Sequence, residues 1–174
     1  MPERSLATQT AREPTPFKVV DSEKILDRTH RIYDSIARRA FELFDGHGRT
    51  IGRDLDDWLT AERELLHPMH INVSETDGEL QVKAEVPGFT AQELEVSVEP
   101  RRLTITGKRE TKAEHKDGKT VYSEQCASQI LRVIDLPAAV DTARVTAALK
   151  DGVLEFAMPK AEPGKKVRID TRAA

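Results

Sequence analysis

The sequence has a single cysteine, no long apolar segment and no excess of charge of one sign. Cys126 is the only cysteine, so an intrachain disulfide is excluded. No run of about 18 apolar residues is present that could cross a membrane, and the first residues lack the apolar region of a secretion signal. From these absences we expect a cytoplasmic protein.

The charges are balanced. The 27 lysine and arginine residues against 30 aspartate and glutamate residues give a net charge of −3. No overall field therefore draws the chain to nucleic acid or to an anionic membrane, and we expect neither as a partner. Hydrophobic residues make up 38% and charged residues 33% of the chain, which predicts one packed core with solvated tails.

The motifs of catalysis and of cofactor binding are incomplete. D-G-K-T at 117–120 lacks the earlier glycine of a phosphate-binding loop, because Ala113 stands there. His67 and His70 are separated by Pro68, which breaks the helix that would place both rings on one face. No signature of a nucleophile surrounds Cys126. We therefore predict no enzyme activity, no cofactor and no metal.

Residues 1–20 are polar and contain P-T-P, which predicts a disordered arm. From Asp21 the pattern is helical, with Asp21 or Ser22 as the cap of a helix that ends at about Asp45. Gly46 and the following glycine close it. Its apolar stripe consists of Ile25, Thr29, Ile32, Tyr33, Ile36, Ala40, Leu43 and Phe44.

A second helix is expected from Asp54, whose carboxylate can cap the first turn while Asp56 and Asp57 complement the positive helix end. Capping accounts for these acids better than a cation site does. Pro68 ends the helical pattern. One side of the helix carries Leu55, Trp58, Leu59, Glu62 and Leu66. Residues 21–68 thus predict a helical hairpin, too small to bury both stripes alone, that packs on another copy, on the rest of the chain or on a bound protein.

This hairpin resembles a short bacterial family of unknown function. The resemblance is carried by R-A-F-E-L-F at 39–44, by G-R-T-I-G at 48–52 and by the D-W-x-x-A-E core at 57–62. It implies no activity.

Residues 69–159 predict a β-sandwich, because short runs of alternating apolar residues are separated by turn residues. The alternating residues are Ile71, Val73, Leu80, Val82, Ala84, Val86, Leu94, Val96, Val98, Leu103 and Ile105. The nearly continuous apolar run at 130–136 predicts a central strand that is buried on both sides. Asp151-Gly152 predicts a tight hairpin turn with positive φ.

Four motifs resemble those of the α-crystallin domain of the small heat shock proteins. A-x-x-x-D-G-V-L at 147–154 is similar to the signature near the end of that domain, and E-V-P-G-F at 85–89, D-L-P at 135–137 and V-R-I at 167–169 stand where the family has similar residues. The resemblance implies a mainly β, immunoglobulin-like sandwich after the helical hairpin. It also implies an ATP-independent chaperone of the stress response, a holdase that binds unfolding client proteins and assembles as a dimer-based homo-oligomer.

The same resemblance implies roles for particular residues. A loop strand that pairs with the neighbouring subunit is formed by Thr120, Val121, Tyr122 and Ser123. In the flexible tail at 160–174, Val167 and Ile169 would anchor in an apolar groove of another dimer, with Val167 a smaller anchor than isoleucine. The groove candidates are Leu94, Val96, Val145, Ala147 and Leu149. The candidates for client binding are Phe41, Phe44 and Trp58, although residues of such apolar helical stripes usually belong to the core and bind clients only where they are exposed in excess.

A second class of function stays open. In it, the β-domain only dimerises the protein and the helical hairpin binds one specific partner, as in a scaffold or adaptor. Selective binding of one protein would distinguish it from a general holdase.

Overall fold

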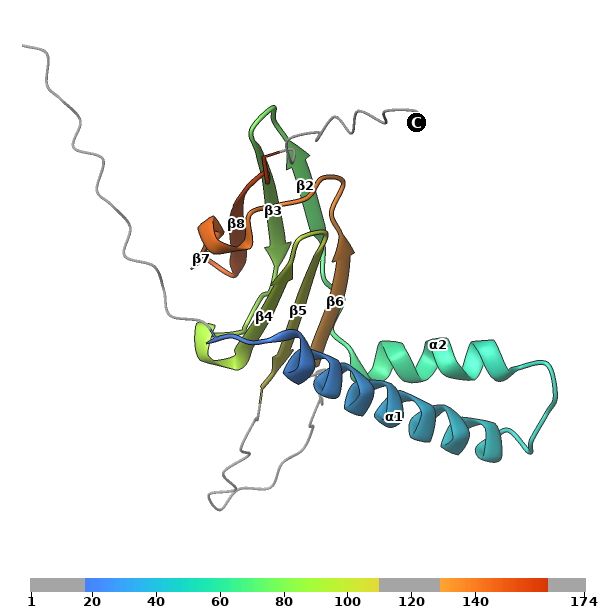
Figure 1. Cartoon of the computed structure of the whole chain (residues 1–174). Coiled ribbons are helices and arrows are strands. Elements are labelled where there is room, and N and C mark those ends of the chain that lie inside the picture. Colours follow the sequence, from blue (N-terminus) through green and yellow to red (C-terminus); the bar gives the residue numbers. More distant parts are fainter. Residues whose placement is uncertain (1–17, 110–128, 163–174) are drawn as a thin grey trace, which may run out of the picture.

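The structure, a computed structural model, describes residues 18–109 and 129–162. Most of the predicted N-terminal arm, the predicted dimer strand at 120–123, Cys126 and the tail anchor at 167–169 lie outside these residues. The described chain has two α-helices and two four-stranded sheets (Figure 1).

Helix α1 (Ser22–Gly46) begins and ends where the sequence predicts. The Asp21 side chain accepts a hydrogen bond from the amide of Lys24 at 3.0 Å, which caps the first turn. At the other end the amide of His47 donates to the carbonyl of Leu43, and Gly48 adopts a φ of +70°. The predicted cap and the glycine end are both confirmed.

Helix α2 (Asp54–Leu65) starts differently from the prediction. Arg53 is the capping residue and no side chain bonds to the first turn, so the predicted cap by Asp54 is wrong. Asp54 already lies inside the helix, whereas a cap must stand just outside it. Asp57 is buried and its Oδ1 lies 2.9 Å from Nδ1 of His47, so it serves the loop between the helices rather than the exposed helix end.

The two helices pack side by side as the predicted hairpin (Figure 1). The buried cluster between them consists of Ile32, Ile36 and Ala61, with Ala40, Leu43, Trp58, Leu65, Leu66 and Leu131 packed around it. Leu55 and Leu59 of the predicted apolar side remain 69% and 43% exposed, in line with the expectation that the hairpin alone cannot bury both stripes. The buried line of α2 runs at four-residue steps through Asp57, Ala61 and Leu65, next to the predicted one.

One sheet has the order β1-β4-β5-β6 and the other the order β2-β3-β8-β7. The strands of the first are β1 (Lys18–Val19), β4 (Leu94–Glu99), β5 (Arg102–Lys108) and β6 (Gln129–Asp135). Those of the second are β2 (Ile71–Glu75), β3 (Glu79–Glu85), β7 (Thr146–Lys150) and β8 (Val153–Pro159). All pairs are antiparallel except β1 with β4.

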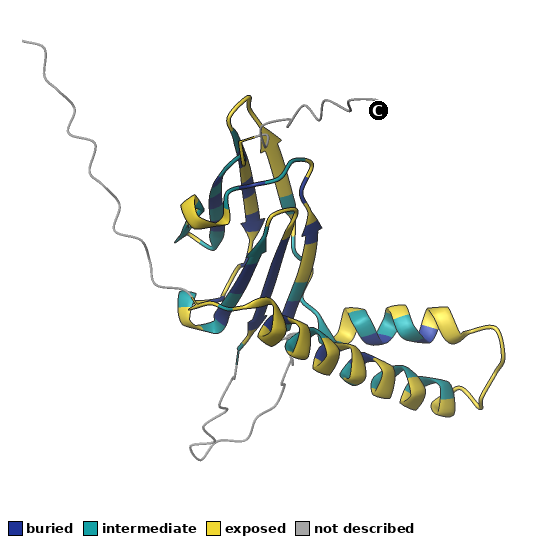
Figure 2. Ribbon diagram, viewed as in Figure 1, coloured by how far each residue is buried: buried dark blue, intermediate teal, exposed yellow. Residues whose placement is uncertain are grey.

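The buried hydrophobic residues of the core come from both sheets, and the strands carry most of the dark blue of buried residues in Figure 2. Strands β3 and β8 alternate between buried and less buried residues, as the period of a half-buried strand requires. Leu80, Val82 and Leu154 are among the side chains with no exposed surface. The predicted fold class, a mainly β sandwich preceded by a helical hairpin, is confirmed.

The turn between β7 and β8 also has the predicted conformation. Asp151 and Gly152 have φ values of +51° and +76°. Positive φ at both central residues gives the turn whose twist matches the two strands it joins.

Strand β6 is an edge strand, so the prediction of a central strand buried on both sides is wrong. Among the described residues it has β5 on one side and no strand on the other. Ile130 and Ile134 face the core, while Val133 is exposed. Leu131, on the outer face, is apolar because it packs against the helical hairpin.

Strand β5 is instead a central strand of this sheet with buried residues on both faces. Leu103 and Ile105 belong to the sandwich core, and Thr104 and Thr106 are buried on the opposite face. Helix α1 lies against β4 and β5, and Arg28 of α1 forms an ion pair with Glu95 of β4 at 3.1 Å. The hairpin therefore rests on the outer face of the first sheet through the beginning of α1.

Candidate protein-interaction surfaces

The predicted groove residues surround one end of the sandwich core. Leu94 and Val96 of β4 are fully buried, and Val145, Ala147 and Leu149 are half-buried and pack against the same core. β4 and β7 are the outermost long strands of their respective sheets on this side. The structure thus brings the five groove candidates to one core from both sheets, although the two on β4 have no exposed surface.

Strand β1 pairs with the edge of β4. Lys18 and Val19 are in parallel register with Glu95 and Val96, and the amide of Val20 donates to the carbonyl of Val96 at 2.9 Å. The arm predicted for residues 1–20 therefore ends earlier than expected. The sequence did contain a signal for this strand, because Val19 and Val20 belong to the only cluster of large apolar residues within residues 1–20.

Strand β2 presents the free edge of the second sheet. Within residues 18–109 and 129–162 its only strand neighbour is β3. Four of its five residues are exposed. An exposed strand edge with unpaired backbone groups is a template for pairing with another strand.

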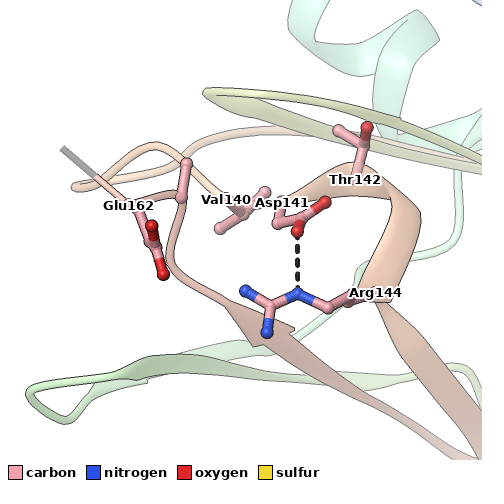
Figure 3. A pocket seen from close by; sticks show the side chains of 6 residues that line it. Val140, Asp141, Thr142, Arg144 and Glu162 are labelled. Carbon is pink, nitrogen blue, oxygen red and sulfur yellow. Dashed lines mark hydrogen bonds and ion pairs between the residues drawn. The ribbon is translucent and has the colours of Figure 1, made fainter. Parts of the chain in front are cut away.

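An open hollow of about 480 Å³ lies beside β8, lined by Val140, Asp141, Thr142, Arg144, Ala161 and Glu162 (Figure 3). Nε of Arg144 donates to Oδ2 of Asp141 at 2.7 Å, and this bond holds the pKa of Asp141 below its usual value, with help from the amide of Ala143. The carboxylate and the guanidinium thus satisfy each other, and the hollow gathers no convergent catalytic groups.

The client-binding candidates all lie on the helical hairpin. Phe41 is 61% exposed, whereas Phe44 and Trp58 are half-buried. The rings of Phe41 and Phe44 are tilted against each other at 6.4 Å, and Trp58 stacks on Tyr33 with ring centroids 6.2 Å apart. The same hairpin also exposes Leu26, Leu55 and Leu59. Sequence reasoning did not select them as client-binding candidates: Leu26 lies outside the predicted stripe of the first helix, and the two others were placed on the apolar side of the second.

No cluster of three or more histidine, cysteine, aspartate or glutamate side chains with the geometry of a metal site occurs in the part of the chain that the structure describes. No helix of that part is long and apolar enough to span a membrane. In the described residues, the β-sandwich has an open strand edge and the hairpin exposes apolar side chains, and both are surfaces suited to contacts with other polypeptides.

Comparison with known proteins places the chain in a family. The Hsp20/alpha crystallin family matches residues 72–171, and the chain belongs to this family. A second family, a protein of unknown function (DUF2934), matches residues 32–67, which confirms the resemblance of the helical hairpin to a short family without known activity.

Individual relatives agree with the family match. Small heat shock protein C4 of Rickettsia felis is 34% identical over 106 residues, which cover 61% of this chain and 64% of that protein. Heat shock protein HSP.16.4 of Streptococcus thermophilus is 30% identical over 139 residues, or 79% of this chain and 89% of that protein. The chain thus spans slightly less than two thirds of the Rickettsia protein.

Among solved structures, heat shock protein 16.0 from Schizosaccharomyces pombe superposes with a TM-score of 0.48 and 29% identity, covering 62% of this chain and 97% of that chain.

Proposed function

We propose that the protein is an ATP-independent holdase that binds unfolding proteins in the cytoplasm and prevents their aggregation. The observation that carries the proposal is the family match over residues 72–171, which spans the sandwich. Capture requires no catalytic group, since binding of exposed apolar segments lowers the concentration of aggregating chains by mass action. The proposed units are the hairpin at 21–68, the sandwich at 69–159 and the tail at 160–174.

The client surface in this proposal is the exposed apolar part of the hairpin. Phe41, Phe44 and Trp58 offer large apolar and aromatic side chains, which contribute most to contacts with unfolded chains. Their partial exposure supports this role. Charge balance argues for client chains rather than nucleic acid or membrane as partners.

Assembly in this proposal uses two further contacts. Residues 120–123 would add a strand to the open edge of β2 in a neighbouring subunit, which gives a dimer through backbone hydrogen bonds. Val167 and Ile169 would dock at the core between β4 and β7 of another dimer. Because β1 pairs with the edge of β4 within the chain, docking of the tail would displace β1.

The energies suit a reversible assembly. Burial of Val167 or Ile169 contributes at most about 1.5–3 kcal/mol before the cost of ordering the tail. One tail therefore binds weakly. Several tails in a closed particle act together through effective concentration, so the particle is stable while its subunits still exchange.

Light scattering of a heat-labile enzyme, warmed with this protein and without ATP, tests the proposal. We expect an excess of the protein to suppress scattering and Phe41→Ser to weaken the suppression. Ile51→Ser is the matched control, because it removes an apolar side chain from the interhelix loop outside the candidate set and should leave the suppression intact. A folded protein in excess that leaves scattering unchanged would contradict the holdase and favour an adaptor with one partner.

A further inference from the structure

Apolar side chains of both helices gather on one side of the helical hairpin. We call this side the outer hairpin face; its residues are Leu26, Tyr33, Phe41 and Phe44 of α1 and Leu55, Trp58 and Leu59 of α2. The stack of Tyr33 on Trp58 shows that the corresponding sides of α1 and α2 point the same way. Along α1, Leu26 precedes Tyr33 by seven residues, and Phe41 and Phe44 follow it by eight and eleven, so all three lie on the side of the Tyr33 ring. On α2, Leu55 precedes Trp58 by three residues and lies on its side, while Leu59, four residues after Leu55, borders the face about 100° around the helix from Trp58.

The opposite side of the hairpin is charged. Arg39 of α1 donates to Glu64 of α2 at 2.6 Å. Arg39 follows Tyr33 by six residues, and Glu64 follows Trp58 by six, so each lies roughly 120° around its helix from the aromatic ring. The ion pair and the aromatic stack therefore join the same two helices on different sides. The hydrogen bond to Glu64, and next the bond to Glu42, raise the pKa of Arg39, which keeps the guanidinium charged.

The sandwich does not cover the outer hairpin face. Arg28, which pairs with Glu95 of β4, lies roughly 140° around α1 from Tyr33, so α1 turns a different side to the sheet. α2 connects to β6 only near its end, where the amide of His67 donates to the carbonyl of Gln129. The hairpin beyond this point extends away from the sandwich (Figure 1).

The hairpin also lacks a sufficient core of its own. Only four apolar side chains of its helices are buried, namely Ile25, Ile32, Ile36 and Ala61, whereas these helices order 25 and 12 residues. So few buried side chains cannot offset the entropy of ordering two helices. The missing burial has to come from a surface outside the chain, and a second copy presents a matching apolar face.

We propose that the outer hairpin face of one chain packs against the same face of a second copy, so that the two hairpins form a four-helix arrangement about a two-fold axis. Such an isologous contact needs no other partner. The exposed parts of the two large side chains Tyr33 and Phe41, at 50% and 61%, and of the three leucines offer on the order of 600 Å² per copy, close to the ~800 Å² of a standard interface.

This contact is distinct from the tail anchor and from the loop strand, and it does not depend on chaperone activity. It adds a third assembly surface, one that belongs to the DUF2934-like hairpin rather than to the α-crystallin domain. It would also mask the proposed client surface in the assembled state.

Trp58 is the only tryptophan of the chain and lies on the outer hairpin face. Its fluorescence emission therefore reports whether this face is in contact with a second copy or exposed to water. The test compares the full-length protein with Leu59→Lys, which places a charge on the face at a partly exposed position, and with the control Ile51→Lys in the interhelix loop, where the side chain is 92% exposed. Mass by sedimentation, Trp58 emission and helical circular dichroism are measured without client.

We expect Leu59→Lys to lower the mass of the assembly at least twofold and to shift Trp58 emission to the red, with helical signal retained. Ile51→Lys should match the unchanged protein. If Leu59→Lys loses helical signal, Leu55→Lys at the more exposed position takes its place. Unchanged mass and emission, or equal effects of the face variant and the loop control, overturn the proposal. Failure of the scattering test with these mass changes present would overturn the holdase alone.

Discussion

At the residue scale, a buried carboxylate ties together the two ends of the interhelix loop. Asp57 is 2% exposed, its Oδ1 lies 2.9 Å from Nδ1 of His47, and its Oδ2 has no hydrogen-bond partner. His47 directly follows α1, and Asp57 lies in the first turns of α2, so the pair fixes how the second helix leaves the loop. A buried polar group with one bond depends strongly on that bond.

Replacement of His47 by alanine should therefore destabilise the hairpin. The carboxylate of Asp57 would lose its one side-chain partner, which costs about 1–3 kcal/mol in the free energy of unfolding. Urea unfolding followed by the emission of the neighbouring Trp58 measures this change. His30→Ala, which removes an exposed imidazole from α1, is the control, and equal stability of the two variants would show that the His47–Asp57 bond contributes nothing.

At the scale of elements, the turn between β7 and β8 requires glycine at its second position. Gly152 has a φ of +76°, and a Cβ there would lie 3.4 Å from Cα of Pro87. Gly152→Ala should lower the free energy of unfolding by about 1 kcal/mol or more, because alanine must adopt a left-handed conformation. Urea denaturation checks this. Gly78→Ala, where no atom lies within 4 Å and φ is not positive, should have a smaller effect; a larger one would contradict the turn argument.

Strand β1 occupies the edge of β4 at which the tail is proposed to dock, so weakening β1 should strengthen binding of the tail. Val20→Pro removes the amide that donates to Val96, and so weakens the pairing of β1 with β4. If the tail docks at this edge, a labelled peptide of residues 163–174 should bind the variant about fivefold more tightly, the equivalent of one hydrogen bond of ~1 kcal/mol. Val20→Ala keeps the amide and serves as control. Equal affinity for both variants would mean that β1 and the tail do not compete.

At the scale of the whole molecule, the sequence predicts what depends on local pattern. Asp21 as helix cap, the Asp151-Gly152 turn and the alternation in β3 depend on neighbours along the chain, and each is confirmed. The family motifs predicted the sandwich for the same reason, since they mark its turns and strand ends.

What the sequence could not predict depends on contacts between distant elements. The apolar run at 130–136 reads as a central strand, yet Leu131 is apolar because it meets the hairpin. Leu55 and Leu59 belong to the predicted apolar side of α2, but the sequence does not show which surface meets this side, and the hairpin leaves both side chains exposed. Lys18 and Val19 form a strand only because the edge of β4 is there to pair with them. The tail anchor, the loop strand and the client surface stay predictions.

The continuity of α1 makes the two ends of the molecule mechanically dependent on each other. It is one unbroken rod of 25 residues, about 37 Å long, with β1 attached at its start and the tip of the hairpin at its finish. A rod transmits displacement instead of absorbing it. A partner that pulls β1 from the sandwich therefore applies a torque to the tip of the hairpin. A partner that binds the tip in turn applies a force to the pairing of β1 with β4.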